Sequence, residues 1–192
     1  DIQRGIIDAL KRQGSVEGKN IEIIDQNGQA DQSKLSTMSQ QLVDKRADVL
    51  VGIATPAVQA LANTTKSIPI VMGAVTDPVN AGLVKNMQHP GGNITGVSDQ
   101  PPVARQIELG LTLMPHATTV GMLYSSSEDN SKSQIDQATK QAESQGLTVK
   151  KFAVPSSNEI AQTVQVMSRQ VDFIYLPLDN TIANAMPTVV QH

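Results

Sequence analysis

The sequence predicts an α/β protein of two Rossmann-like lobes in series, each built on a parallel sheet. Three observations support this class. Segments with apolar side chains at every third or fourth position alternate with short runs rich in Val and Ile, which is the order of helices and strands. These runs are apolar throughout, which is typical of strands buried on both faces of a parallel sheet. After the turn sequence HPGGN at residues 89–93, the alternation starts again.

The first lobe is predicted to span residues 1–98. Its first helix should end at Gly14, because Ile2, Ile6 and Leu10 share one helical face before it. Asp31 is a candidate cap for the second helix. The expected helices are 1–13, 31–43, 56–66 and 78–85, and the expected strands are 21–24, 48–54, 68–75 and a last one that begins at 94.

The second lobe is predicted to span residues 99–192. Its expected helices are 102–114, 131–145, 157–169 and 181–191, and its expected strands are 118–124, 147–154 and 171–177. The chain opens directly with a helix, and the helix at 181–191 has neither a C-cap nor a following strand. We therefore expect a fragment of a longer protein, incomplete at both ends.

Composition argues against several functional classes. The 15 Lys and Arg residues are scattered against 18 Asp and Glu, with a net charge of −3, so nucleic acid is not an expected partner. The absence of Cys excludes disulfides and thiol catalysis. No nucleotide-binding, hydrolase or metalloprotease motif occurs, and His89, His116 and His192 are isolated in the sequence. We expect no metal, no cofactor and no enzymatic activity.

Small polar residues follow four of the predicted strands. They are Thr55-Pro56, Thr76-Asp77-Pro78, the run YSSSEDNS at 124–131, and Leu178-Asp179-Asn180. In open parallel sheets, ligands bind at the carboxyl ends of the strands, where helices begin with unpaired N–H groups. A Thr at the N-cap followed by Pro at the first helical position would give a rigid helix start able to receive an anion.

Structural roles explain the same residues about equally well. Thr and Ser before a helix are ordinary caps, and Ser131 with Gln134 matches the capping-box spacing. Asp179 follows an apolar strand, so its carboxylate is expected to be partly desolvated and to favour a cationic partner. It could equally cap the helix at 181. The sequence leaves these alternatives open.

Four phrases together resemble a known family. TPAVQALANTTKSIPIVMGAVTDPVNAGLV, HPGGNITGVSD, YSSSEDNS and YLPLDNTIANAM are similar to ABC-transporter substrate-binding proteins of the tryptophan/tyrosine-uptake type. The resemblance implies the type I periplasmic-binding fold and a carrier that captures a solute outside the cytoplasmic membrane. Its implied partners are an amino acid and the permease and ATPase of an importer. An aromatic amino acid is the first expectation from the family, and an aliphatic one fits the aromatic content of 2% about as well. Members are surface lipoproteins or periplasmic proteins.

The resemblance also implies a set of ligand-binding residues in the cleft between the lobes. They are Ala54, Thr55, Pro56, Thr76, Asp77, Pro78, Ser98, Asp99, Tyr124, Ser125, Asn130, Ser131, Asp179 and Asn180. Thr55, Thr76 and Ser131 are the leading candidates to hold a carboxylate. Asp179 is the candidate partner of the α-ammonium. The lobes would close around the ligand about a hinge that includes residues 97–101 and a strand near Leu178.

Two other functions remain alternatives at this stage. The effector-binding core of a LacI-like transcription regulator has the same two-lobed fold, and its DNA-binding head would precede the present chain. A two-domain α/β enzyme is the other alternative, but the sequence offers no nucleophile with an adjacent base.

Overall fold

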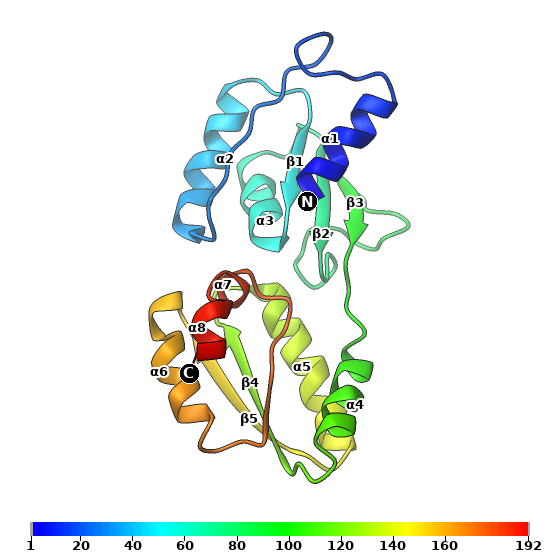
Figure 1. Cartoon of the computed structure of the whole chain (residues 1–192). Helices are drawn as coiled ribbons and strands as arrows, with labels where there is room; N and C mark the ends of the chain where they lie inside the picture. Colours follow the sequence, from blue (N-terminus) through cyan, green and yellow to red (C-terminus); the bar gives the residue numbers. More distant parts are fainter. Residues whose placement is uncertain (1, 192) are drawn as a thin grey trace. The chain divides into compact units, whose positions relative to one another are not determined.

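The computed structural model of the protein describes residues 2–191 and consists of two compact units (Figure 1). Unit 1 is Asp1–Asp99 and unit 2 is Gln100–His192, against an expected boundary between residues 98 and 99. Each unit contains one three-stranded sheet, and every strand pair in it is parallel. The predicted α/β class with parallel sheets is therefore confirmed.

The sheet of unit 1 has the strand order β1-β2-β3. Its elements are α1 (Ile2–Arg12), η1 (Gln32–Lys34), α2 (Leu35–Asp44), β1 (Leu50–Ile53), α3 (Thr55–Thr64), β2 (Ile70–Val75) and β3 (Ile94–Ser98). Asp31 caps η1 as predicted, because its carboxylate accepts a hydrogen bond from the Ser33 N–H at 3.1 Å. The sequence thus located the six elements that build this unit's sheet and helices.

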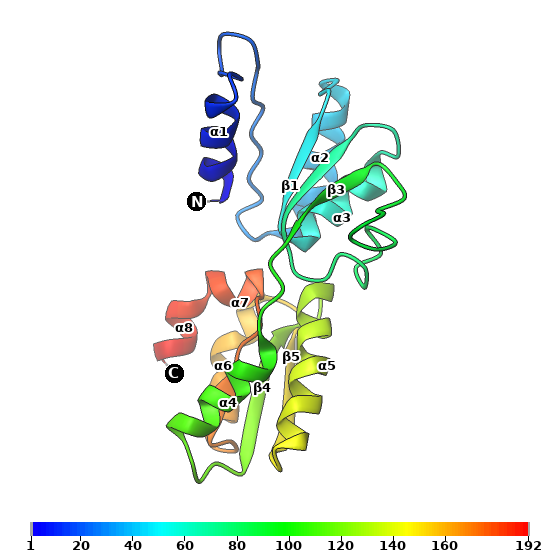
Figure 2. The same ribbon diagram turned by 90° about the vertical axis from the view of Figure 1, so that its right-hand side faces the viewer.

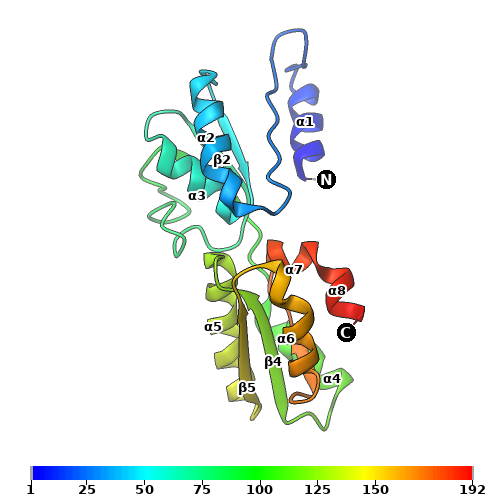
Figure 3. The ribbon, with the colours of Figure 1, turned by 90° about the vertical axis from the view of Figure 1, so that its left-hand side faces the viewer.

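Burial on both faces of the first sheet was predicted and is wrong for unit 1. One face carries Ile70 and Met72 and packs against α2 and α3. The other face leaves Val51 and Val71 43% and 38% exposed. Helix α1 and the extended chain that follows it lie on this side (Figures 2 and 3), and Ile2 and Ile6 of α1 lie close to Gly73 of β2. The apolar strands therefore have one packed face and one largely open face.

Two further elements predicted in unit 1 do not form. Residues 21–24 are extended but make a single bridge, from Ile21 to Glu17, because β-branched side chains favour extended backbone and a strand also needs a partner to pair with. Residues 78–85 form successive turns rather than a helix. Asp77 accepts the Asn80 N–H, and Gly82 adopts φ +70°, which together reverse the chain.

Gly52 allows α3 to pack closely against β1. A Cβ at this position would lie 2.6 Å from Val58 Cγ2 and 3.1 Å from Val58 Cα. Val58 and Leu61 of α3 are buried in the core of unit 1. The small residue in the strand thus determines how closely the start of the helix approaches the sheet.

Unit 2 has the strand order β5-β4-β6 and helices on both faces of its sheet. Its elements are α4 (Val103–Leu113), β4 (Thr119–Ser125), α5 (Asp129–Ser144), β5 (Thr148–Val154), η2 (Ser157–Glu159), α6 (Ile160–Met167), β6 (Phe173–Tyr175), α7 (Asn180–Asn184) and α8 (Met186–Gln191). In Figure 1, α4 and α5 lie on one side of the sheet and α6 and α8 on the other. Two separate apolar cores result, so burial on both faces is confirmed here.

Two helices of unit 2 are shorter than predicted. The segment 157–169 begins as the 3₁₀ turn η2 and continues as α6 only to Met167. The segment 181–191 divides into α7 and α8 around Ala185, because Pro187 has no N–H to continue the helical hydrogen bonds. Among the helices of residues 2–191, none combines the length and apolar character that crossing a bilayer requires.

Replacing Gly52 by Ala should destabilise unit 1, because the added methyl group would overlap Val58. We expect the free energy of unfolding to fall by about 1–3 kcal/mol, the usual cost of overpacking. Gly5→Ala is the matched control, since nothing lies within 4 Å of a Cβ there. That change should raise stability by about 0.5–1 kcal/mol, because Ala favours a helix over Gly. Urea denaturation of both variants provides the measurement, and an unchanged midpoint for Gly52→Ala would contradict the packing argument.

Candidate functional site

The carboxyl ends of the strands in unit 1 bring several predicted residues together. The Thr76 hydroxyl, directly after β2, donates to Asp99 Oδ1 at 3.2 Å. The Ser98 hydroxyl, at the end of β3, donates to the Thr76 carbonyl oxygen at 3.1 Å. Parallel strands end at the same edge of a sheet, so this cluster is the arrangement that the sequence predicted. We refer to it, together with the start of α3, as the unit 1 edge.

Two alanines at the unit 1 edge have left-handed backbone conformations. Ala54 follows β1 with φ +73°, and Ala74 lies near the end of β2 with φ +51°. Such values are unfavourable for a residue with a Cβ and are held by surrounding structure, often at functional sites. The Ala54 N–H donates to the Gly73 carbonyl oxygen at 3.0 Å, which fixes the chain just before α3.

Thr55 does not cap α3 as predicted. Ala54 is the N-cap, Thr55 is the first helical residue, and no side chain caps this helix end. Thr55 is only 2% exposed, and within the described residues its hydroxyl oxygen has no hydrogen-bond partner. A buried hydroxyl without a partner is costly. The Thr55 hydroxyl lies at the start of α3, where the helix has unpaired N–H groups and the positive end of its dipole. It can therefore donate a hydrogen bond to an anionic oxygen there.

The remaining predicted residues of unit 1 form the turn after β2. Asp77 is half-buried, and its Oδ1 accepts the Asn80 N–H at 3.1 Å. Pro78 is buried, and its carbonyl oxygen accepts the Leu83 N–H at 2.9 Å. Pro56 is half-buried in the first turn of α3. Asp77 and Pro78 thus set the course of the backbone in this turn, and Pro56 does so in the first turn of α3.

Asp179 lies at the carboxyl edge of the sheet in unit 2 and is 3% exposed. Its Oδ1 accepts the Ile182 N–H at 2.8 Å, so it caps α7, which is one of the two roles left open by the sequence. Its Oδ2 accepts the Ser125 N–H at 2.6 Å and the Ser131 hydroxyl at 2.7 Å. Both carboxylate oxygens are therefore already engaged by protein donors.

Glu128 is the second buried carboxylate at this edge and was not among the predicted site residues. It is fully buried and precedes α5. Its Oε1 accepts from the Thr181 N–H at 2.9 Å and the Thr181 hydroxyl at 2.8 Å. Its Oε2 accepts from the Asn180 N–H at 3.0 Å, the Asn180 amide at 2.7 Å and the Asn130 amide at 3.1 Å. Five donors thus converge on one carboxylate.

The capping box predicted from Ser131 and Gln134 is wrong. Helix α5 begins at Asp129, so Ser131 lies inside its first turn and donates to Asp179 instead. Gln134 donates to the Leu178 carbonyl oxygen at 3.3 Å and accepts the Leu178 N–H at 2.9 Å. Both residues therefore join the start of α5 to the segment before α7.

The side-chain amide of Asn130 has its nitrogen engaged and its oxygen unpartnered. Its Nδ2 donates to Glu128 and, at 2.8 Å, to the Leu178 carbonyl oxygen. Asn130 is 3% exposed, and its Oδ1 has no hydrogen-bond partner within the part of the chain that is described. Three of the predicted residues, Ser125, Asn130 and Asn180, thus lie at one edge of the sheet, in contact with Asp179 or Glu128.

Tyr124 is half-buried and packs against the core beneath α4 and α5.

The two carboxylates at this edge differ in acidity. Burial, together with the charge of Glu128, raises the pKa of Asp179 above its ordinary 3.8. Burial also acts to raise the pKa of Glu128, but the donors of Asn180, Asn130 and Thr181 outweigh it, so that pKa lies below the ordinary 4.5. Glu128 is accordingly the carboxylate that holds its negative charge more firmly.

A signal for Glu128 was present in the sequence. It stands three residues after the end of β4, and Asp179 stands four residues after the end of β6, the neighbouring strand. Carboxylates after two adjacent parallel strands must meet at one edge of the sheet. Strand order, which a single sequence does not give, was the missing information.

Among the described residues, no group of three or more His, Asp or Glu is arranged to hold a metal ion.

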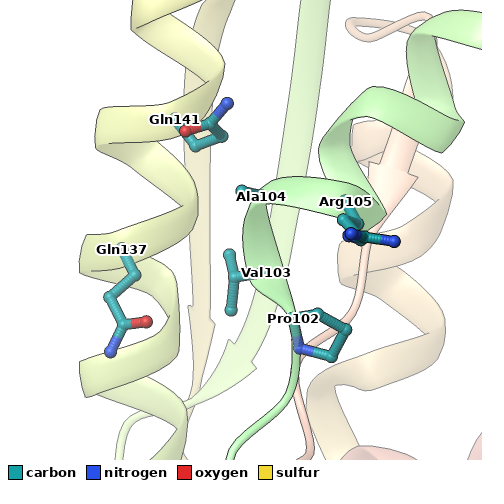
Figure 4. A pocket seen from close by; sticks show the side chains of 6 residues that line it. All are labelled: Pro102, Val103, Ala104, Arg105, Gln137 and Gln141. Atoms are coloured by element: carbon teal, nitrogen blue, oxygen red, sulfur yellow. The ribbon is translucent and has the colours of Figure 1, made fainter.

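An open groove elsewhere in unit 2 lies between the start of α4 and the middle of α5. Its cavity volume is about 410 Å³, and it is lined by Pro102, Val103, Ala104, Arg105, Gln137 and Gln141. Figure 4 shows Gln137 and Gln141 extending from α5, whereas the Arg105 side chain points away from them. None of these six residues was predicted to bind a ligand. Their charged group is directed away from the groove, so we place the candidate site at the strand ends.

A family model and a curated relative both place this chain among substrate-binding proteins. The family model described as ABC transporter substrate binding protein matches residues 1–192. A tyrosine-binding protein of Clostridioides difficile (strain R20291) is 40% identical over 187 residues, which are 97% of this chain and 54% of that protein. This chain thus spans about half the length of the curated relative.

Two solved structures are similar over 99% of this chain and 64% of their own. One is an ABC domain of Streptococcus pneumonia in complex with L-Trp, with 53% identity and a TM-score of 0.95. The other is a conserved domain protein of Vibrio cholerae, with 37% identity and a TM-score of 0.96. The predicted type I periplasmic-binding fold is confirmed.

The two carboxylates predict opposite pH dependences of the free energy of unfolding. The raised pKa of Asp179 gives a stabilising contribution that is fully present below 3.8 and is lost as pH rises through its folded-state pKa. The lowered pKa of Glu128 gives a contribution that is present above 4.5 and is lost as pH falls through its folded-state value. Lowering the pH from about 7 towards 3.8 should therefore stabilise the wild type relative to Asp179→Asn. Denaturant titrations of both proteins across this range measure the difference, and a constant difference would contradict the assignment.

Proposed function

Because this chain belongs to the family of ABC transporter substrate-binding proteins, we propose that it binds an amino acid outside the cytoplasmic membrane and delivers it to an importer. The permease and ATPase of that importer are the proposed protein partners. The chain would act by binding alone, without bond chemistry. The family match favours this function over the effector-binding core of a transcription regulator.

The observation that carries the proposal is the buried, unpartnered hydroxyl of Thr55 at the start of α3. Removing a hydroxyl from water without a partner is unfavourable unless a ligand supplies that partner. A carboxylate oxygen would supply it and would also accept from the first N–H groups of α3, where the helix dipole favours negative charge. Thr76, after the neighbouring strand β2, is the proposed second hydroxyl, and it would exchange its hydrogen bond to Asp99 for one to the ligand carboxylate.

An aromatic amino acid is the proposed ligand class. The C. difficile relative is named a tyrosine-binding protein, and the streptococcal neighbour was solved with L-Trp. Each charge-assisted hydrogen bond contributes roughly 1.5–3 kcal/mol, and micromolar affinity needs about 8 kcal/mol. A few such bonds with modest apolar burial are sufficient. Ser131 and Asp179 remain proposed contributors from unit 2, and Asp179 would act mainly through its charge because both of its oxygens accept from the protein.

A thermal-shift screen of the full-length protein tests the function directly. L-Trp and L-Tyr at 100 times their Kd should each add about 2.7 kcal/mol of stability. Leucine and an unrelated sugar serve as comparison ligands. The amino acid function would be refuted if no amino acid shifted the melting temperature.

Replacing Thr55 by Val should weaken ligand binding without destabilising the fold. Valine has the same shape but lacks the hydroxyl, so one hydrogen bond to the ligand carboxylate is lost. We expect the Kd to rise about tenfold to a hundredfold. Stability of the unliganded protein should be unchanged or slightly higher, because a buried hydroxyl without a partner is removed. Calorimetric titration and urea denaturation measure the two effects.

Thr64→Val is the matched control at the other end of the same helix. The Thr64 hydroxyl donates to the Ala60 carbonyl oxygen at 2.8 Å, within α3. This variant should keep the wild-type Kd. If Thr55→Val bound the ligand as tightly as the wild type, Thr55 would not bind the ligand carboxylate.

A further inference from the structure

The Glu128 side chain accepts hydrogen bonds from residues far along the chain as well as from its own helix. Glu128 is the N-cap residue of α5, yet its side chain forms no hydrogen bond with that helix's first N–H groups. Its five donors belong instead to Asn130 and to the first two residues of α7, about fifty positions later. A fully buried carboxylate is costly to desolvate, and these five hydrogen bonds compensate for that cost. Loss of any donor would leave part of the buried charge uncompensated, so the five donor groups must keep their positions.

The contacts of Glu128 and Asp179 are reciprocal. Glu128 lies between β4 and α5 and accepts donors from the start of α7. Asp179 lies between β6 and α7 and accepts donors from Ser125 and Ser131, at the end of β4 and the start of α5. Each segment therefore supplies a carboxylate to the other. Movement of one segment would leave a buried charge without its donors.

This arrangement fixes the orientation of the Asn130 amide. The Nδ2 group is held by Glu128 at 3.1 Å and by the Leu178 carbonyl oxygen at 2.8 Å, both of which are acceptors. Turning the amide over would place Oδ1 against these two acceptors. The Oδ1 atom is consequently kept as a buried acceptor, and it has no donor of its own among residues 2–191.

A ligand ammonium group is the donor that fits this acceptor. Two carboxylates lie in hydrogen-bond networks on the same edge, and no Lys or Arg contact with either is found in the described part of the chain. The local charge is therefore negative, which favours a cationic N–H over a neutral one.

We propose that Glu128 is a positioning residue that orients the Asn130 carbonyl oxygen to accept a hydrogen bond from the α-ammonium group of the ligand. This inference rests on the proposed amino acid function and assigns its cationic end to Asn130. Glu128 itself does not touch the ligand. It acts by holding the Asn130 amide and the start of α7 in one arrangement.

The test compares an amino acid with its des-amino analogue. The full-length protein is titrated with L-Trp and with 3-(indol-3-yl)propionate, which lacks only the ammonium group. Glu128→Gln replaces a carboxylate oxygen by an NH₂ group that faces donors, so it loses part of the network. We expect the Kd for L-Trp to rise at least about tenfold, and the Kd for the analogue to change less than about threefold.

Two further variants separate positioning from folding. Asp172→Asn is the matched control, because Asp172 accepts the Thr118 and Thr119 N–H groups and so joins β4 to the segment before β6 at the opposite end of these strands. It should lower the melting temperature and leave both Kd values unchanged. Asn130→Ala should reproduce the selective loss for L-Trp, and the Glu128→Gln/Asn130→Ala double variant should lose no more than either single one.

The outcomes are distinct. A wild type that binds neither compound, and no other amino acid in the thermal-shift screen, refutes the amino acid function, and this inference with it. A wild type that binds L-Trp, combined with an equal loss of both ligands in Glu128→Gln, would show that Glu128 serves only the fold. Additive losses in the double variant would show that Glu128 does not act through Asn130.

Discussion

The carboxyl edge of unit 2 depends on two buried carboxylates that are compensated by neutral donors. Glu128 and Asp179 together accept eight hydrogen bonds from side chains and backbone N–H groups. Hydrogen bonds stabilise such charges only while every donor stays in place, so the geometry is strongly restricted. The positions of the start of α5 and the start of α7 both follow from this constraint.

The unit 1 edge is organised in a different way. Backbone conformation at Ala54 and Ala74, together with the close approach of α3 at Gly52, determines where the start of α3 lies. The edge presents hydroxyl and N–H groups, and one of those hydroxyls, on Thr55, remains without an acceptor. Restricted backbone in unit 1 thus has the same consequence as the buried carboxylates in unit 2, since each leaves one polar atom oriented and unpaired.

Most of the fold was predictable, because apolar periodicity reports on helices and strands directly. The failures have different causes. Residues 21–24 have strand composition without a strand beside them, and residues 78–85 have a helix-like start that Asp77 and Gly82 turn back. At the candidate site, the sequence pointed to polar residues at the strand ends, but the contacts of Glu128 and of Ser131 depend on β4 lying next to β6. Contacts between residues about fifty positions apart are not visible in local sequence patterns.

The two edges, each considered separately, differ in the polarity of what they leave unpaired. At the unit 1 edge the unpaired groups lie at the positive end of a helix dipole, which favours an anion. At the unit 2 edge the unpaired atom is a carbonyl oxygen surrounded by two carboxylate networks, which favours a cation. Each edge, taken by itself, therefore favours one of the two charged groups of the amino acid proposed as the ligand.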